Sequence, residues 1–206
     1  MRDERPTVFI IDDDVSVRDA IVGVVTSVGM RAIPFESTHD LLLAPPQTGP
    51  SCLILDVRLQ GSSGLDFQQD LARAGIDIPI VFITGYGDVP MTVRAMKAGA
   101  IEFLTKPFRD QDLLDAIALA LERNRTMLEH RGVIDGLRTR YITLTNRERQ
   151  VMALVIAGKL TKEIAAELGT SEITIKVHRG QVMRKMQARS IVELVNIATK
   201  LGDTIP

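Results

Sequence analysis

Short apolar runs alternate with stretches of helical spacing over the first half of the chain. Runs of four or five β-branched, aliphatic or aromatic residues are typical of strands buried on both faces. They cover residues 7–11, 52–55, 80–83 and 101–104. Between them, apolar residues recur every three or four positions, and Gly29, Gly75 and Gly99 follow three of these helical segments as C′ glycines do. Pro45 and Pro46 are expected to end a fourth helix. The pattern predicts a doubly wound α/β domain around a five-stranded parallel sheet.

The pattern becomes purely helical further along the chain. A helix is expected to start near Asp110 and meets no breaker until about Gly132. We interpret residues 124–142 as a helical linker. A solvated surface helix and a coiled-coil seam both remain open for it, because two heptads are too few to separate them. Gly132 and Gly136 also leave room for a break.

Residues 143–206 are expected to form four short helices. Thr145 and Glu148 have the spacing of a capping box at the start of the first helix. The second helix covers residues 161–168, and a short turn containing Gly169 leads to the third, with Ser171 as its N-cap. Two helices joined by a short glycine-bearing turn, the second one basic, are typical of a helix-turn-helix.

Length and composition agree with two domains. A chain of 206 residues with 45% hydrophobic content can bury one sizeable core and one small core. No run of 18 apolar residues occurs, and no hydrophobic segment follows the charged start of the chain, so we expect neither a membrane span nor a signal peptide, and a cytoplasmic location. Cys52, the single cysteine, lies in an apolar strand and is expected to be a buried, unreactive thiol.

The formal net charge of −1 hides an asymmetry along the chain. Residues 1–125 hold 12 Lys or Arg against 18 Asp or Glu, whereas residues 126–206 hold 13 against 8. A basic half of this kind is expected to meet a polyanion. The basic residues concentrate at Lys176, Arg179, Arg184, Lys185 and Arg189.

Five polar residues lie where the apolar runs of the first domain end: Asp12, Asp13, Asp56, Thr84 and Lys106. The carboxyl ends of parallel strands meet at one edge of the sheet, so these side chains should converge on one pocket. Three carboxylates in one place require a cation, and Mg2+ prefers oxygen ligands. An ammonium and a hydroxyl are suitable partners for phosphate oxygens. The set therefore indicates phosphoryl transfer to a carboxylate.

The segments that carry these residues resemble the receiver domain of two-component response regulators. The resemblance covers roughly residues 5–123, within a receiver assigned to residues 1–123, and implies a flavodoxin-like fold. It is carried by Ile-Asp-Asp-Asp at 11–14, Leu-Asp-Val-Arg at 55–58, Ile-Thr-Gly at 83–85 and Leu-Thr-Lys-Pro-Phe at 104–108. It implies that Asp56 accepts the phosphoryl group, that Asp13 and Asp56 bind Mg2+ with the backbone carbonyl of Arg58, and that Asp12 acts through coordinated water.

The same resemblance assigns the switching residues. Lys106 is expected to hold the phosphoryl group, Thr84 to report its arrival, and Phe103 to follow as the switch aromatic by changing rotamer. One departure from the family is visible in the loop after the phosphoacceptor. Receivers often carry Met-Pro where this chain has Leu59 and Gln60, which leaves the rigidity of that loop open.

Residues 143–206 resemble the LuxR-type DNA-binding domain of NarL/FixJ-class regulators. The matching positions are Leu144, Thr145, Arg147, Glu148, Ile164, Ala165, Leu168 and residues 173–178. In the third helix, Ile175, Val182 and Met186 fall on one side at 100° per residue and should be buried. The opposite face should enter the major groove of DNA.

Positions on that face suggest individual roles. Lys176 is suited to guanine and Val177 to a thymine methyl group, and four further residues are placed for phosphates. The candidate DNA contacts are Thr161, Lys162, Thr174, Lys176, Val177, Arg179, Gln181, Arg184 and Lys185. His178 is expected to be a packing or capping residue. Gly180 replaces the polar residue that family members often carry there, so operator preference does not transfer from them.

Together these features imply a DNA-binding response regulator and not an enzyme. A partner histidine kinase is expected to phosphorylate Asp56 in a Mg2+-dependent reaction. Phosphorylation should promote a homodimer through the surface of residues 91–108, and with it sequence-specific binding to double-stranded DNA. RNA polymerase is a further candidate partner. Unmasking of the DNA-binding domain remains an open alternative to dimerisation.

Two other functions are alternatives to this one. The first is a constitutive DNA-binding protein whose receiver serves only for dimerisation or docking; a response to a phosphodonor would separate it from the main interpretation. The second is a Mg2+-dependent phosphohydrolase with an aspartyl nucleophile. Residues 12–14 disfavour it, because no Thr follows where such enzymes place one.

Overall fold

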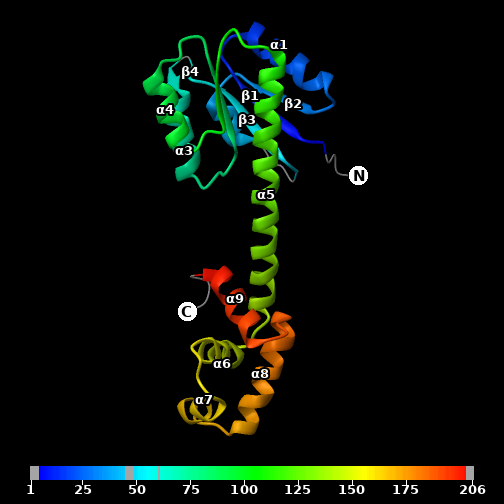
Figure 1. Ribbon diagram of the computed structural model, residues 1–206, viewed down its shortest axis with the longest axis vertical. Coiled ribbons are helices and arrows are strands. Elements are labelled where there is room, and N and C mark those ends of the chain that lie inside the picture. The colour runs from blue at the N-terminus through cyan, green and yellow to red at the C-terminus, as the bar shows by residue number, and fades with distance from the viewer. Residues whose placement is uncertain (1–4, 45–48, 60, 203–206) are drawn as a thin grey trace. The chain divides into compact units, whose positions relative to one another are not determined.

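The structure, a computed structural model, describes residues 5–44, 49–59 and 61–202 (Figure 1). Pro45 and Pro46, expected to end a helix, and Gln60, in the loop after the phosphoacceptor candidate, lie outside the described residues. So do residues 1–4 at the charged start of the chain. The chain forms two compact units, one ending at Leu128 and the other beginning at Glu129.

The first unit is built on a five-stranded parallel sheet, as predicted. Its strands are β1 (Thr7–Ile11), β2 (Arg31–Phe35), β3 (Ser51–Asp56), β6 (Ile80–Thr84) and β7 (Glu102–Thr105), in the order β2-β1-β3-β6-β7. Residues of β1 and β3 are buried throughout, which explains their continuous apolar runs. In the register of the sheet, Asp56 is opposite Ile83 and Thr84 is opposite Thr105. The carboxyl ends of β3, β6 and β7 therefore lie side by side.

Helices cover both faces of this sheet. They are α1 (Val15–Ser27), α2 (Thr38–Leu43), α3 (Gly64–Arg73), α4 (Val89–Lys97) and the first part of α5 (Asp110–Ile142). Alternate strand residues form two cores: Val8 and Ile10 pack with α1 and α5, whereas Phe9 and Ile11 pack with α3 and α4. The three expected C′ glycines have positive φ angles, of 78°, 70° and 93°. The doubly wound arrangement is confirmed.

A small hairpin that the sequence pattern did not predict follows β3. Strands β4 (Arg58–Leu59) and β5 (Ser62–Ser63) pair antiparallel, so backbone pairing joins the described residues on either side of Gln60. Gly64, directly after this hairpin, closes the loop against β3: its N–H donates to the carbonyl of Val57 at 2.9 Å. A Cβ atom at position 64 would lie 2.3 Å from the carbonyl oxygen of Asp56, so only glycine fits.

Helix α5 runs without interruption through Gly132 and Gly136. Its residues divide between the two units. Asn124, 4% exposed, accepts a hydrogen bond from the N–H of Ser51 at the start of β3, at 2.9 Å. Leu137 and Tyr141 are buried in the core of the second unit. Among the described residues, no helix combines the length and the apolar character needed to cross a membrane.

The second unit is all-α, as predicted. After α5 it contains α6 (Asn146–Ile156), α7 (Thr161–Glu167), α8 (Glu172–Met186) and α9 (Ile191–Leu201). The expected capping box is present: Thr145 Oγ1 accepts from the N–H of Glu148, and the Glu148 carboxylate accepts from the N–H of Thr145. Ser171 caps α8 by accepting from the N–H of Thr174. Gly169, with φ of 61°, makes the turn between α7 and α8.

Candidate metal centre and nucleic-acid interface

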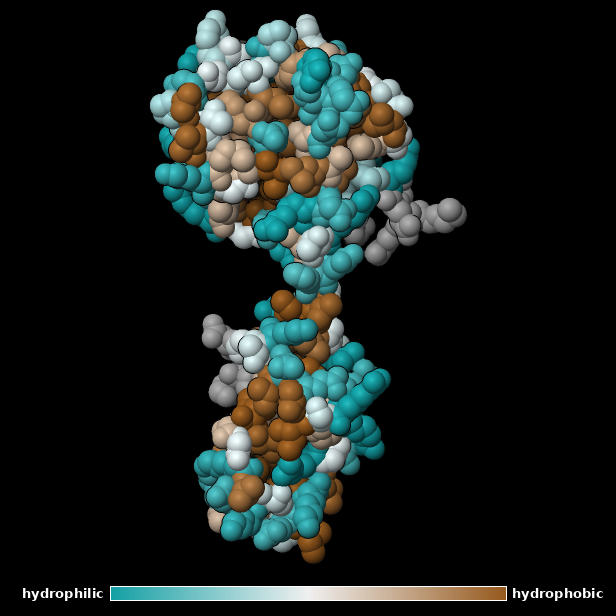
Figure 2. Space-filling model, in the orientation of Figure 1, coloured by the Kyte–Doolittle hydropathy of each residue, from teal (hydrophilic) through white to brown (hydrophobic). Residues whose placement is uncertain are grey.

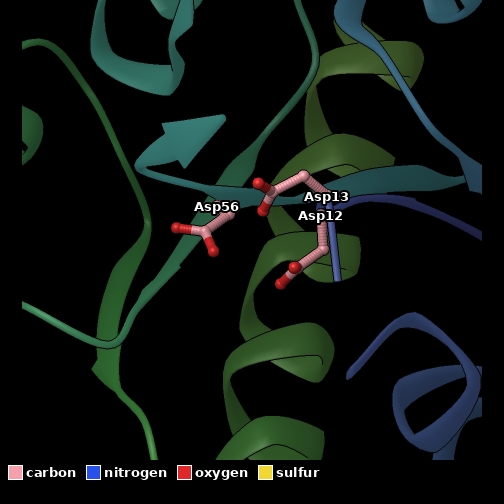
Figure 3. Close-up of side chains that lie close together, drawn as sticks. All are labelled: Asp12, Asp13 and Asp56. Atoms are coloured by element: carbon pink, nitrogen blue, oxygen red, sulfur yellow. The ribbon is translucent and has the colours of Figure 1, made fainter. Parts of the chain in front are cut away.

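Three carboxylates meet at the carboxyl edge of the sheet (Figure 3). Asp12 and Asp13 follow β1, and Asp56 is the last residue of β3. One oxygen of each lies within 4.8 Å of the others. Asp12 is 0% exposed and Asp56 6%, so their charges are shielded from water and need compensation inside the protein. A set of carboxylate oxygens at this spacing is the kind of site that holds Mg2+.

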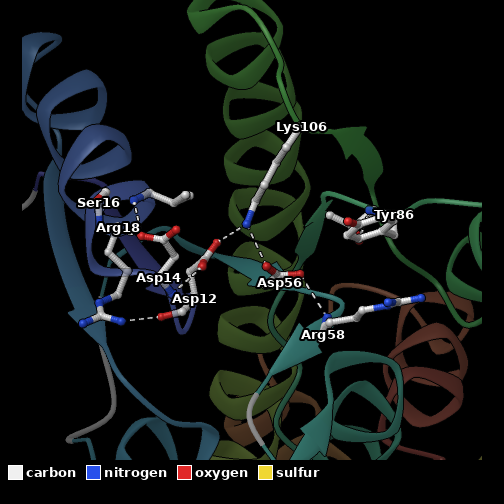
Figure 4. Close-up of polar contacts among 10 residues, drawn as sticks. Asp12, Asp14, Ser16, Arg18, Asp56, Arg58, Tyr86 and Lys106 are labelled. Atoms are coloured by element: carbon white, nitrogen blue, oxygen red, sulfur yellow. Dashed lines mark hydrogen bonds and ion pairs between the residues drawn. The ribbon is translucent and has the colours of Figure 1, made fainter.

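Lys106 brings the nearest positive charge into this cluster (Figure 4). Its Nζ donates to Asp12 Oδ2 at 2.6 Å and to Asp56 Oδ2 at 2.7 Å. The loop after β7 is placed by a hydrogen bond from the N–H of Lys106 to the carbonyl of Thr84, at 2.7 Å. One ammonium does not balance three carboxylates. The remaining negative charge and the oxygen ligands both fit a divalent cation.

Burial and hydrogen bonding act against each other in this pocket. Burial has the largest effect on Asp12 and raises the pKa of its carboxyl, while hydrogen bonds from Lys106 and the Asp14 amide offset only part of the rise. Burial alone would lower the pKa of Lys106, but its hydrogen bonds to Asp12 and then to Asp56 outweigh this and raise it. Lys106 therefore stays protonated, whereas ionised Asp12 would gain from further positive charge.

Backbone amides orient two of the carboxylates. The N–H of Asp14 donates to Asp12 Oδ1 and the N–H of Arg58 to Asp56 Oδ1, both at 2.9 Å. Arg18, which sequence reasoning missed, is only 7% exposed and donates from Nη1 to the carbonyl oxygen of Asp12 at 2.6 Å. Its only signal is its spacing of three and seven residues from the buried Ile21 and Val25 on α1.

Thr84 and Phe103, the expected switch residues, lie on β6 and β7, the two strands that follow β3 in the sheet. Thr84 is fully buried at the end of β6, and its Oγ1 accepts from the N–H of Tyr86 at 3.2 Å. The half-buried Phe103 packs on Phe82, with ring centroids 6.2 Å apart. Tyr86 was also missed: the guanidinium of Arg58 lies 5.1 Å from its ring centroid, so this contact joins the loops after β3 and β6 (Figure 4).

In the second unit, α8 buries one face and exposes the other. Ile175, Val182 and Met186 are at most 1% exposed, which confirms the predicted buried stripe. On the opposite face, Ile173 is 74% exposed and Val177 57%. These two apolar side chains are four residues apart and so lie on the same side of α8.

The candidate DNA contacts fall into two groups. Lys162, Lys176, Val177 and Arg184 are exposed, and Arg184 donates to Gln181 on its own helix. The others make contacts within the domain. Arg179 donates to Thr161 Oγ1 at 2.8 Å, Thr174 Oγ1 lies 2.9 Å from Ser171 Oγ, and Lys185 donates to Glu148 and to the carbonyl of Thr143.

Comparison with known proteins finds a family match for each unit. Residues 8–118 match the response regulator receiver domain, and residues 142–198 match the bacterial regulatory proteins of the luxR family. Nodulation protein W of Bradyrhizobium diazoefficiens is 50% identical over 96% of this chain and 87% of its own length. Response regulator protein TmoT of Ectopseudomonas mendocina is 45% identical over 100% of this chain and 93% of its own length.

A solved structure agrees with these relatives. The response regulator StyR is 46% identical, covers 95% of this chain and 99% of its own, and superposes with a TM-score of 0.81. This chain thus aligns over nearly its whole length with two proteins named as response regulators. The chain belongs to the two-component response regulators that join a receiver domain to a LuxR-family DNA-binding domain, and it is a transcription regulator rather than an enzyme.

Proposed function

We propose that Asp56 accepts a phosphoryl group from a sensor histidine kinase and that this controls dimerisation and DNA binding. The observation that carries the proposal is the pair of hydrogen bonds from Lys106 to Asp12 and Asp56, because one ammonium group thereby joins the ends of three strands around Asp56. A carboxylate oxygen of Asp56 attacks phosphorus. The new P–O bond forms as the P–N bond of phosphohistidine breaks, and the imidazole nitrogen leaves with the electron pair and takes a proton.

The surrounding residues prepare this transfer. Asp13, Asp56 and the carbonyl of Arg58 would hold Mg2+, with Asp12 acting through a coordinated water, and the bound cation would neutralise phosphate oxygens. The Arg58 amide keeps Asp56 Oδ1 oriented. Lys106, now hydrogen-bonded to two carboxylates, would turn one donor to a phosphoryl oxygen. The Thr84 hydroxyl would donate to another, and Phe103 would follow by changing rotamer.

Exposed apolar side chains on and before α4 support dimerisation through this helix. Tyr86 is 74% exposed, Val89 76%, Val93 45% and Met96 41%. Figure 2 shows apolar surface on the first unit between α4 and α5. A phosphoryl group brings a charge of nearly −2 to the loops that lead into α4, so its arrival would reshape this surface. The homodimer would then present two DNA-binding domains to two half-sites and bind with higher avidity.

On DNA, the exposed face of α8 would enter the major groove. Lys176 and Val177 would read base edges, while Lys162 and Arg184 would bind phosphates. The protein would act in the cytoplasm, where it meets DNA, and RNA polymerase would be a partner at promoters. A substitution that removes one cation from the DNA backbone should reduce the slope of log affinity against log salt by about 0.9.

The test is light scattering with Mg2+ and beryllofluoride, a mimic of the acyl phosphate. The wild type should shift from monomer to dimer only when both are present, and Asp56→Asn should not shift. Asp77→Asn, at an exposed position before the amino end of β6, is the matched control and should behave as wild type. If the wild type stayed monomeric in beryllofluoride and bound DNA with the same affinity with and without it, the constitutive DNA-binding function would be favoured.

A second pair of variants tests the surface. Val93→Glu should keep phosphorylation, measured by intact mass after acetyl phosphate treatment, but remain monomeric. Val28→Glu is matched to it, because Val28 is 47% exposed and Val93 is 45% exposed. It should still dimerise. If the two variants had the same oligomeric state, the dimer surface would not include Val93 on α4.

A further inference from the structure

Lys185 lies in the last turn of the basic helix α8, yet its charge is directed into the domain. Its Nζ donates to Glu148 Oε2 at 2.6 Å and to the carbonyl oxygen of Thr143 at 3.0 Å. The side chain of Lys185 is 28% exposed, and that of Glu148 is 6% exposed. Two of the three ammonium donors are therefore used within the second unit.

The carboxylate that Lys185 contacts is already part of a structural junction. Glu148 Oε2 also accepts from the N–H of Thr145 at 2.7 Å, completing the capping box of α6. Thr143 is the first residue after α5, which ends at Ile142. Through two hydrogen bonds Lys185 thus joins the last turn of α8 to the end of α5 and the start of α6. A buried carboxylate needs such a cation, because an unpaired charge there is strongly unfavourable.

Its neighbours on α8 behave differently. Arg184 is exposed, and its guanidinium donates to Gln181 on the same helix. Lys176 is also exposed, and no hydrogen bond or ion pair holds its side chain in the described part of the chain. These two cations are free to meet DNA. To turn either of its two hydrogen-bonding donors toward a phosphate, Lys185 would have to leave Glu148 without its partner or give up the Thr143 carbonyl.

We propose that Lys185 is a positioning residue that sets the orientation of the recognition helix and does not itself bind a phosphate. The inference rests on the proposed binding of α8 in the major groove. Lys185 and Lys176 are nine residues apart on one helix, about 13 Å at 1.5 Å per residue. A small rotation of α8 about its clamped end therefore moves Lys176 relative to the bases. Losing the clamp should disturb base recognition more than general attraction to DNA.

The test compares Lys185→Met with Arg184→Met in the full-length chain, with Mg2+ and beryllofluoride present. The probes are a 30-base-pair duplex selected from a random library with the wild type, and a scrambled duplex of the same composition. Binding is measured over a series of salt concentrations. The temperature is chosen from circular dichroism melts so that every variant is folded.

Lys185→Met should weaken binding to the selected duplex about tenfold, weaken binding to the scrambled duplex much less, and leave the salt slope unchanged. Arg184→Met should weaken both duplexes alike and lower the slope by about 0.9. A slope reduced by the same amount in Lys185→Met would show that Lys185 binds a phosphate and would overturn the inference. Unchanged affinity in folded Lys185→Met would reduce its role to stability and would overturn it as well.

Two further variants make the assignment specific to the Glu148 ion pair. Glu148→Gln should reproduce the loss of selectivity, and the double variant Glu148→Gln/Lys185→Met should lose no more than either single variant, because both remove the same interaction. Additive effects of the two substitutions would overturn the inference. Failure of the wild type to select any duplex would instead refute DNA binding by α8, and the inference with it.

Discussion

The acidic pocket and the recognition helix use charged side chains in opposite ways. In the pocket, charges from the ends of separate strands are buried together: Asp12 is 0% exposed, and Lys106 contacts both it and Asp56. On α8, Lys176 and Arg184 lie on one segment and face solvent. Removing a charge from the pocket leaves buried partners unpaired. Removing either of these two charges from α8 leaves no buried charge without a partner. The first change should affect stability and the second binding.

The largest effect is expected from Lys106→Met. Without the ammonium, two buried carboxylates lose their partner, and breaking a buried ion pair costs about 3 kcal/mol or more. The free energy of unfolding of the first unit should fall by roughly that amount in EDTA, and Mg2+ should restore part of it, since it supplies positive charge to the same carboxylates. Urea unfolding followed by NMR signals of the β3 and β6 amides measures this.

Lys97→Met on α4 provides the control for that experiment. Lys97 is exposed, so its replacement should change stability by less than about 0.5 kcal/mol. If the two variants were equally stable in EDTA, charge compensation by Lys106 would not contribute to the stability of the pocket.

Glu148→Gln tests whether the second unit also contains a buried, paired charge that contributes to stability. Its buried carboxylate is paired with Lys185, and hydrogen bonds to charged groups contribute roughly 1.5–3 kcal/mol. Burial alone would raise the pKa of Glu148, but hydrogen bonds from Lys185 and Thr145 outweigh it and hold the pKa below its ordinary value of 4.5. The stabilisation is therefore complete above pH 4.5 and is lost as the pH falls through the pKa of the folded state.

Wild type and Glu148→Gln should thus differ most at neutral pH and converge in acid. Urea unfolding followed by amide signals of α6 and α8, at a series of pH values, measures the difference. The exposed Glu129 offers a control, because Glu129→Gln should stay close to the wild type at neutral pH. A difference that grows on acidification would have the wrong sign for a lowered pKa.

Lys176→Ala tests the exposed basic face of α8. Its side chain is exposed, so stability should change by less than about 0.5 kcal/mol. Binding to a selected duplex should weaken by roughly 1–3 kcal/mol, with relaxed preference at one base position. Lys200→Ala on α9 is the exposed control. Repeating the library selection with each variant identifies the affected position, and a uniform loss at all positions would place Lys176 on the phosphate backbone.

Gly180→Ala should have the smallest effect, and a favourable one. Gly180 lies in the interior of α8, and nothing lies within 4 Å of where a Cβ atom would be. Replacing it should stabilise the second unit by about 1 kcal/mol through helix propensity. Gly158→Ala makes the contrast, because Gly158 has φ of 81° and the same change should be destabilising. Urea unfolding of both variants measures the two signs.

Much of the candidate site was predictable because it lies at the ends of strands. A polar residue directly after an apolar run marks the edge of a parallel sheet, and Asp12, Asp56 and Thr84 all have this pattern. Capping by Thr145 and Ser171 was predictable for a similar reason, since each hydrogen bond spans three residues. The sequence itself thus determined the fold class, the helix starts and the residues able to carry the chemistry.

Only the tertiary structure decided how the charges are paired. Lys106 meets Asp12 across 94 residues of sequence, and Lys185 meets Glu148 across 37. The stacking of Arg58 on Tyr86 and the β4–β5 hairpin have no periodic signal of their own. The helical spacing of Arg18 indicates its burial but not its hydrogen bond to the carbonyl of Asp12. Local patterns report which face of an element avoids water. They cannot report which cation a buried carboxylate finds, because that depends on how distant elements pack.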